Sequence, residues 1–598
     1  MSEKKVSFWR VFWPSLIAGF AVIALIFMFF TTVIGSMFTG AVSTSSPTNN
    51  KTILQLNLSD EIAEVADGKI NIDLFNMGIQ SKIGLAGLLH GFEKAATDNS
   101  IKGIYIELTN AMCGFATATE IRNAIKRFQE ESGKFVVAYH SGEMVSLKQY
   151  YIASAANESY GFHSTNMDFR GLGAELMFFK GLADKLEIEM QVIRGSNNDF
   201  KSAVEPYFLK EMSDSSRLQI ETYLTNIWTE LKTSIGKDRN ISVAELDALA
   251  ESGKIRKMTD AVTFKLINDT KYKDEILTLL AEKVEVKDVK DLNLMSFEKY
   301  AQSKLMDQQN IANAKGANIA VIIAEGGIAV NGDGIASTKL TKLIREARND
   351  KDIKTIVLRV NSPGGSALAS EEIWREVKLA NDEKKVIISM GDVAASGGYY
   401  IAAPGYKIFA EENTITGSIG VFGMIPYAGK AAEDKLGLTF DRVATNKFAA
   451  PMSLFKKLTP EEFAIVQDEV DYIYDEFLGR VSEGRGLSKE QVNVVARGRV
   501  WTGRDALRVG LVDTIGGVKD AIAYAAKEAG IDKPIVRYYP RLKKEAWADI
   551  VESFKEETTG STGDNSKMTK ELIQTYRQIK SIENIVGIQA RLPYMINW

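Results

Sequence analysis

Residues 353–373, IKTIVLRVNSPGGSALASEEI, decide the fold because they have a counterpart in residues 101–121, IKGIYIELTNAMCGFATATEI. Each stretch joins a β-branched run to a loop and a segment of helical spacing, which is typical of a βαβ unit. Residues 134–153 realign on 384–402 in the same order. The aligned segments of the two stretches are separated by about 250 residues, far more than the roughly 20–50 residues of a solenoid repeat. The sequence therefore predicts two copies of one domain.

The two copies differ at the positions where chemistry would occur. The second copy contains Asn361-Ser-Pro-Gly-Gly-Ser366 and, further on, Ser396 in the run GDVAASGGYYIA. The first copy has Leu147 in place of that serine and has lost the paired glycines. Downstream the loss is reversed, because the first copy keeps Lys201 where the second has Ala449. Together the copies would supply one serine–lysine pair.

Length and composition exclude several classes of protein. A chain of 598 residues can form two or more hydrophobic cores. Its formal net charge of −4 gives no indication of nucleic-acid binding. The single cysteine, Cys113, excludes an intrachain disulfide and is expected to be a small buried residue. We expect neither a cofactor nor a metal.

Residues 11–38 form an uncharged, apolar run. About 20 such residues suffice to cross a bilayer, whereas the apolar core of a cleavable signal peptide has about 7–15. Basic residues precede the run, and none follows it before Lys51, so the positive-inside rule places residues 1–10 in the cytoplasm. The sequence predicts a single-pass protein of the inner (cell) membrane, with both copies on the periplasmic, extracytoplasmic side.

Short β-branched runs alternate with amphipathic stretches in each copy, which predicts α/β domains with parallel sheets. In the second copy the expected strands are 319–323, 355–360, 385–389 and 407–410, and the expected helices are 337–349 and 366–381. The predicted parts of the chain are a cytoplasmic N-terminus (1–10), a transmembrane anchor (11–38), a first copy (51–295), a second copy (317–545) and a helical C-terminal tail of unknown role (546–598).

Ser396 has the surroundings that a nucleophile requires. Small residues flank it on both sides, and the two glycines that follow would let a substrate backbone approach closely. It follows a predicted strand and precedes a helical segment, whose dipole would favour negative charge at this point. Residues 361–366 follow another strand and could direct backbone amides towards an oxyanion. Each motif alone could be an ordinary glycine turn, but both are missing from the first copy.

Three histidines and one lysine are candidates for the base. His90, His140 and His163 all lie in the first copy, and none has a recognisable catalytic sequence context. A lysine can act as the base if its pKa, ordinarily about 10.4, is lowered by burial. Lys201 lies between apolar and small residues, and its counterpart in the second copy is alanine. These observations favour Lys201.

The motifs GDVAASGGYYIA, NSPGGS, TGSIGVFG (residues 416–423) and KSAVEP (from Lys201) resemble those of the long, duplicated form of the signal peptide peptidase A family. The resemblance extends from the apolar run to residue 540. It implies a serine endopeptidase made of two tandem ClpP/crotonase-like domains after one transmembrane helix.

The same resemblance assigns roles to individual residues. It implies that Ser396 is the nucleophile, that Lys201 is the general base and that Ser418 hydrogen-bonds to the lysine. It also implies an oxyanion hole at Gly364 and Gly365. The implied substrates are signal peptides that remain in the membrane after preprotein processing, and the implied assembly is a homotetramer. The sequence leaves open whether the serine and the lysine meet within one chain or between chains.

Other functions remain to be weighed. A crotonase acting on acyl-CoA is disfavoured by the predicted export, because CoA is a cytoplasmic cofactor. A non-enzymatic membrane scaffold would not explain why the copies have lost opposite members of the pair. A broader exported protease that degrades misfolded or membrane proteins stays as the alternative.

Overall fold

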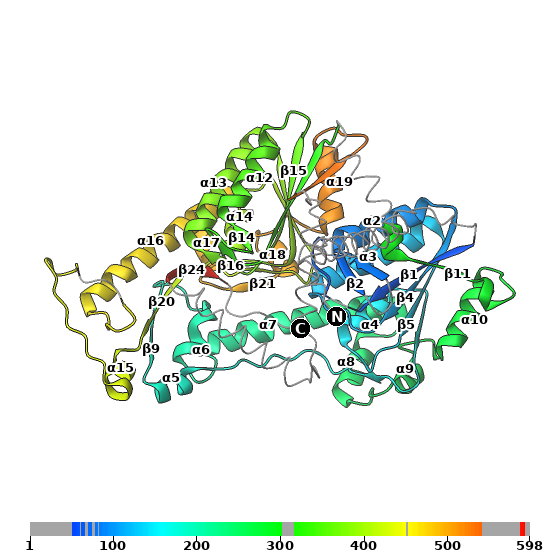
Figure 1. Cartoon of the computed structure of the whole chain (residues 1–598), viewed down its shortest axis with the longest axis horizontal. Coiled ribbons are helices and arrows are strands. Elements are labelled where there is room, and N and C mark those ends of the chain that lie inside the picture. Colours follow the sequence, from blue (N-terminus) through cyan, green and yellow to red (C-terminus); the bar gives the residue numbers. More distant parts are fainter. Residues whose placement is uncertain are drawn as a thin grey trace, which may run out of the picture.

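The computed structural model describes residues 51–59, 61–65, 70–73, 78–81, 83–301, 316–449, 453–540 and 587–591. Two large sheets dominate it, one from each half of the chain, and they lie side by side in Figure 1. The first sheet has the order β10-β7-β5-β4-β1-β11, with all neighbours parallel. Its strands are β1 (Thr52–Leu58), β4 (Ile101–Leu108), β5 (Phe135–His140), β7 (Glu158–Gly161), β10 (Asp269–Thr270) and β11 (Asn293–Ser296).

The second sheet repeats this arrangement. Its strands follow the order β22-β18-β17-β15-β12-β23, again with parallel neighbours. They are β12 (Ile319–Glu325), β15 (Thr355–Ser362), β17 (Val386–Ala395), β18 (Lys407–Ala410), β22 (Thr514–Ile515) and β23 (Val536–Tyr539). Strands β19 (Ile415–Gly417) and β21 (Val500–Thr502) extend it from the far end of β17. The six-strand order is the same in both halves, as a duplication requires.

Helices follow the strands in matching order in the two halves. Those of the first half are α2 (Leu85–Thr97), α3 (Phe115–Ser132), α4 (Leu147–Ala153), α5 (Lys180–Leu186), α6 (Glu205–Phe208), α7 (Asp214–Arg239), α8 (Val243–Ser252), α9 (Met258–Thr263) and α10 (Lys273–Lys283). Those of the second half are α12 (Ser337–Asn349), α13 (Ala367–Glu383), α14 (Gly397–Ala402), α15 (Gly429–Leu436), α16 (Pro460–Arg485), α17 (Lys489–Val495), α18 (Gly503–Arg508) and α19 (Val518–Glu528). Because helices cover both faces of each sheet, the central strands are buried almost throughout.

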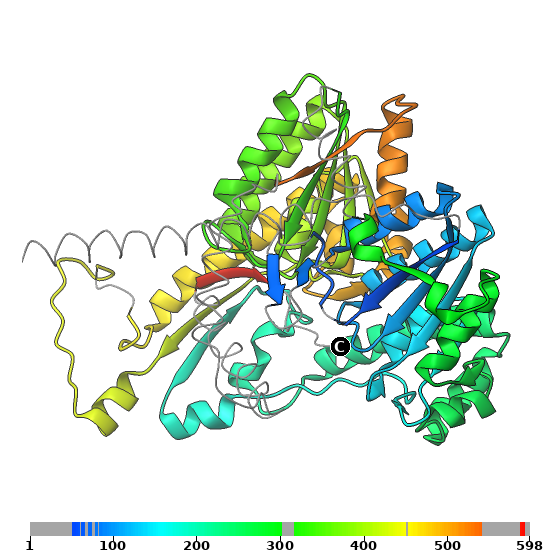
Figure 2. The same cartoon turned by 45° about the vertical axis from the view of Figure 1, so that its right-hand side comes forward.

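A third sheet joins the two halves. Its order is β14-β13-β16-β24-β20-β9, with β9 from the first half and β20 from the second paired antiparallel. The teal β9 and the yellow-green β20 run together towards α5 and α15 in Figure 2. The strands are β9 (Glu189–Arg194), β13 (Ile328–Ala329), β14 (Ile335–Ala336), β16 (Gly364–Ser366), β20 (Phe422–Tyr427) and β24 (Gly587–Arg591). Of the predicted helical tail 546–598, the structure describes only the five residues of β24.

A buried ion cluster fixes the first half against the second. Arg359 of β15 is fully buried, and its guanidinium donates to Glu64 at 2.9 Å and to Glu120 at 2.6 Å. Burial raises the pKa of Glu64 to about 7, although Arg359 acts in the opposite direction. A second contact reinforces this one, because the Asp392 carboxylate accepts from the backbone and hydroxyl of Thr117 at the start of α3. Both contacts involve β17, the strand that leads to Ser396, because Arg359 also donates to Ser389 and Met390 of β17 and Asp392 lies in it.

Replacement of Arg359 by methionine is expected to destabilise the protein by about 3–5 kcal/mol, because it would remove the cation that two buried carboxylates share. Urea unfolding measures the change. The control is Arg345→Met, which is expected to cost about 1 kcal/mol or less, because Arg345 is half-exposed and its partner Glu376 keeps a second ion pair with Arg348. Equal losses in the two variants would contradict the role given to the cluster.

The predicted single-pass location in the inner membrane is contradicted by the structure. Within the described ranges, no helix is long and apolar enough to cross a bilayer. The longest of them, α7 and α16, have 26 residues each and carry charged side chains along their length, and such charges are costly in a hydrocarbon environment. Residues 11–38, on which the prediction rested, lie outside the described residues.

Candidate active site

Three segments bring the predicted serine–lysine pair together. Lys201 follows β9 and precedes the short 3₁₀ turn Ser202–Val204. Ser396 lies between β17 and α14, and Ser418 lies between β19 and β20. Because β9 pairs with β20, the lysine segment of the first half is carried across to the serine segments of the second.

The amine of Lys201 contacts both serines of the second half. Its Nζ lies 2.9 Å from the Ser396 Oγ, 2.9 Å from the Ser418 carbonyl oxygen and 3.0 Å from the Ser418 Oγ. A neutral amine has two N–H donors and one lone pair. If both donors point to Ser418, the lone pair remains to accept a proton from the Ser396 hydroxyl. The pair forms within one chain.

The surroundings of Lys201 favour its neutral form. The side chain is fully buried, and burial lowers its pKa well below 10.5 because a protonated amine would lose its hydration. Its hydrogen-bond partners are two hydroxyls and a carbonyl, and none of them carries the negative charge that would stabilise an ammonium ion. The electrostatics therefore match what a general base needs.

Ser396 is held in a strained backbone conformation. Its φ of 54° and ψ of −115° place it outside the regions that a side chain with a Cβ ordinarily adopts. The strain is supported on both sides, because its N–H donates to the Gly417 carbonyl and its carbonyl accepts from Tyr400, both at 2.8 Å. The turn fixes the direction of the hydroxyl towards Lys201.

The glycine segment of β16 lies next to this turn. Ser362 pairs with Ala394, and a Cβ placed on Gly398 would lie 2.6 Å from the Ser362 carbonyl oxygen. Gly364 has a φ of 92°, and its N–H donates to the Ser362 Oγ at 3.1 Å. A Cβ on Gly365 would lie 2.0 Å from the Ile328 carbonyl oxygen, so a side chain is excluded there. The structure thus brings the predicted oxyanion residues beside the serine turn.

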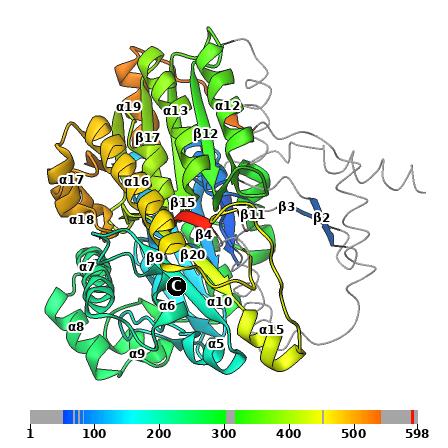
Figure 3. The ribbon, with the colours of Figure 1, turned by 90° about the vertical axis from the view of Figure 1, so that its left-hand side faces the viewer.

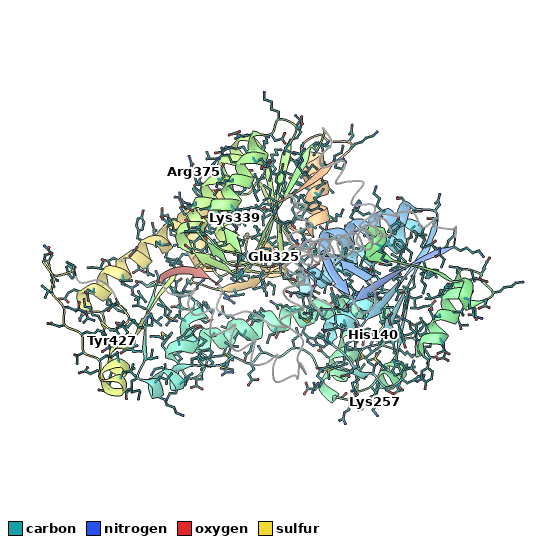
Figure 4. The ribbon with its side chains drawn as sticks, in the orientation of Figure 1. His140, Lys257, Glu325, Lys339, Arg375 and Tyr427 are labelled. Carbon is teal, nitrogen blue, oxygen red and sulfur yellow. The ribbon has the colours of Figure 1, made fainter. Side chains whose placement is uncertain are left out.

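The histidines take no part in this arrangement. His140 ends β5 in the first half, where Figure 4 places it, and burial lowers its pKa to about 3. His90 is buried in α2 with its pKa lowered to about 4 for the same reason. His163 contacts the ring of Tyr272 at 4.6 Å between centroids. Within the described part of the chain, no histidine hydrogen-bonds to Ser396 or Lys201.

Sequence analysis missed the residues that position Lys201. The Asn198 amide donates to the Val421 carbonyl at 3.1 Å, which fastens the lysine loop to the segment after Ser418. Gly498 has a φ of 78°, and a Cβ there would lie 2.5 Å from the backbone nitrogen of Lys201. The Asn198 contact could have been suspected from its place in the NDFKSAVEP motif, whereas nothing near Gly498 in the sequence indicates that it touches Lys201.

Comparison with known proteins gives a consistent result. The profile of peptidase family S49 matches residues 128–287 and 378–532, which include Lys201, Ser396 and Ser418. The chain is 33% identical to "Serine protease SPPA, chloroplastic" of Arabidopsis thaliana, over 80% of this chain and 69% of that protein. It is also 33% identical to "Protease 4" of Haemophilus influenzae, over 84% of this chain and 83% of that protein.

A solved structure of a ClpP1 mutant from Listeria monocytogenes aligns with 37% of this chain and 98% of its own, at a TM-score of 0.24 and 16% identity. A shorter relative, "Putative signal peptide peptidase SppA" of Enterococcus faecium, is 38% identical over 33% of this chain and 58% of that protein. The S49 profile and the relatives matched over most of the chain agree with the two-copy α/β architecture. The chain therefore belongs to peptidase family S49, and it is a serine protease.

Proposed function

We propose that this protease hydrolyses signal peptides left by preprotein processing, with Ser396 as the nucleophile and Lys201 as the general base. The observation that carries the proposal is the 2.9 Å separation of the Lys201 Nζ and the Ser396 Oγ at a buried site. Because burial lowers the pKa of Lys201 and favours the neutral amine, Lys201 is able to accept the hydroxyl proton as Ser396 attacks a peptide carbonyl.

The rest of the reaction uses the same groups. The attack forms a tetrahedral intermediate that carries an oxyanion. We propose that the backbone N–H groups of Gly364 and Gly365 stabilise this oxyanion. The Gly364 N–H would have to turn from the Ser362 Oγ to take this role. Protonated Lys201 then gives its proton to the leaving amine, an acyl-enzyme forms on Ser396, and the neutral lysine activates water for deacylation. Ser418 holds the amine in place throughout, through its carbonyl and its hydroxyl.

Substrate preference is the direct test of the signal-peptide proposal. We expect kcat/KM to be about tenfold or more higher for an apolar signal-peptide sequence than for a polar peptide of equal length, as a few buried methylene groups would give. Both peptides would carry the same fluorogenic reporter, and both would be assayed in mild detergent. Equal values would favour the alternative, a broader-specificity protease of misfolded proteins.

We further propose that the two halves are tandem ClpP/crotonase-like domains and that the chain assembles as a homotetramer. Several large apolar side chains on and after α15 are exposed, and such patches favour contact with another subunit. They are Leu436, Leu438, Phe440, Val443 and Phe448. Figure 3 shows α15 and α5 projecting near one another at the edge of the molecule. Sedimentation of the full chain would show a monomer if this assembly does not form.

Replacement of Gly498 by alanine is expected to lower kcat by about 100-fold, because the new Cβ would displace the Lys201 backbone and a shift of about 1 Å suffices for such a loss. The matched control is Gly510→Ala. Gly510 has a similar φ of 82°, but a Cβ there would have no atom within 4 Å. The control variant therefore introduces the same kind of backbone strain without a contact to Lys201. Equal kcat in the two variants would show that Gly498 does not position the lysine.

A further inference from the structure

The side-chain amide of Gln219 lies inside the protein, beside the loop that carries Lys201. Gln219 belongs to α7, which runs next to β21 in Figure 1, and the residue is only 1% exposed. Its Nε2 donates to the Phe200 carbonyl at 3.1 Å and to the Ser202 Oγ at 2.8 Å. Phe200 and Ser202 are the two neighbours of Lys201 in the chain, so one amide group holds the backbone on both sides of the lysine.

The oxygen of the same amide reaches the segment that holds the lysine amine. The Gln219 Oε1 accepts from the Val500 N–H at 3.2 Å. The other end of that peptide group, the Arg499 carbonyl, accepts from the Ser418 N–H at 2.7 Å. Because the Ser418 carbonyl and hydroxyl contact the Lys201 Nζ, these hydrogen bonds lead from the lysine backbone through Gln219 to the lysine amine. Gln219 therefore connects the two ends of Lys201.

An amide suits this position because its two ends have opposite hydrogen-bonding character. The Phe200 carbonyl is able only to accept and the Val500 N–H only to donate, so the partners fix which end of the Gln219 amide faces the lysine loop. The three bonds are buried, where a polar group without a partner is destabilising. Neither a hydrocarbon side chain nor a carboxylate would make the same set of bonds.

Comparison of the two halves associates this glutamine with the lysine. α16 is the counterpart of α7, since both helices have 26 residues and both begin after a hydroxyl N-cap, Thr459 for α16 and Ser213 for α7. The position of Gln219 then corresponds to Ile465, which is 51% exposed. The second half also has Ala449 in place of the lysine. The glutamine and the lysine therefore occur together in one half and are both missing from the other.

We propose that Gln219 is a positioning residue of the serine–lysine site, because it fixes the Lys201 backbone relative to the Ser418 segment. The proposal rests on the function proposed above for Lys201 as the general base. In the described part of the chain, no hydrogen bond joins Gln219 to Ser396 or to the lysine amine. Gln219 therefore acts through the place of Lys201: it keeps the Nζ within reach of the Ser396 Oγ and the amine away from water.

Gln219→Met in the full chain tests this role, because methionine has a similar length but is unable to donate to the lysine loop. We expect kcat for a fluorogenic peptide to fall by about 10- to 100-fold, the loss that a displacement of about 1 Å gives, while KM stays within about twofold. Movement of the loop would also admit water to the Lys201 amine. The pH inflection of fluorophosphonate labelling should then move upwards, towards the ordinary lysine value.

The matched control is Gln149→Met. Gln149 is another buried glutamine of the first half, 3% exposed, and its Oε1 accepts from the Ser146 N–H at 2.8 Å in the capping box of α4. It lies outside the loop that carries Lys201, so this variant is expected to keep the wild-type kcat, KM and pH inflection.

A second variant, Gln219→Glu, keeps the test decisive if the methionine variant does not fold, because glutamate has the same shape as glutamine. Its carboxylate would be unable to donate to the Phe200 carbonyl, and its negative charge would favour the protonated form of Lys201. We therefore expect a larger upward shift of the pH inflection than in Gln219→Met.

Two outcomes would overturn the proposal: an unchanged kcat in Gln219→Met, or a lowered kcat with an unmoved pH inflection in both Gln219 variants. The second would show that Gln219 supports only the fold. Equal labelling rates of the wild type and Lys201→Met at every pH would instead refute the general base on which the proposal rests.

Discussion

Replacement of Ser396 by alanine is expected to abolish peptide hydrolysis, with kcat/KM lowered on the order of 10⁶-fold, as for the removal of the nucleophile in other serine peptidases. The fold should survive, because the change removes one hydroxyl from a turn whose backbone bonds to Gly417 and Tyr400 remain. Initial rates with a fluorogenic peptide and the melting temperature of the variant measure the two effects.

The control for this variant is Ser370→Ala. Ser370 is also fully buried in the second half, but its hydroxyl donates to the carbonyl of Ser366, the residue before α13, and does not contact Lys201. Its replacement is expected to leave most of the activity. Substantial turnover by Ser396→Ala, above any contaminant level, would remove Ser396 as the nucleophile.

Replacement of Lys201 by methionine is expected to lower kcat/KM by about 10³- to 10⁴-fold, the loss that accompanies removal of a general base. The same change should not lower the melting temperature at pH 7. Burial depresses the folded pKa of Lys201, so the stability that this group contributes is greatest above its unfolded pKa and falls as the pH drops towards the folded value. At neutral pH the buried amine therefore lowers the free energy of unfolding, and replacement by methionine removes this destabilising contribution.

Lys148→Met is the matched control. Lys148, near the start of α4, is also buried, burial lowers its pKa too, and its Nζ donates to the Cys113 carbonyl in the first half. We expect this variant to keep most of its activity. Similar losses of activity in both lysine variants would indicate a general effect of removing a buried amine.

Much of the fold could be predicted from local patterns. The expected strand 407–410 corresponds to β18 and the expected helix 337–349 to α12, while the strands expected at 355–360 and 385–389 extend as β15 and β17. Parallel strands covered on both faces consist of continuous apolar runs with β-branched residues, and this signal is strong in a single sequence. Because the domain is duplicated, the same pattern of strands and helices occurs twice in the sequence, and each copy supports the prediction made from the other.

The contacts that build the site could not be predicted in the same way. β9 and β20 are far apart in the chain, and their pairing is set by packing between the halves. β24 is five residues long and has a glycine at its start, so it shows no strand periodicity. Lys201 and Ser396 could be paired by comparing the copies, because each copy lacks the other's residue, but their 2.9 Å contact depends on these long-range strands.

The account depends most on a neutral Lys201 that activates Ser396, and the rate of fluorophosphonate labelling of Ser396 as a function of pH tests this directly. A protonated amine is unable to accept the hydroxyl proton, so labelling of the wild type should rise with pH through an inflection well below 10.5. In Lys201→Met the labelling should be slow at every pH, without that inflection. An inflection that persists in Lys201→Met, or that disappears when His90, His140 and His163 are replaced together in a folded protein, would contradict the account.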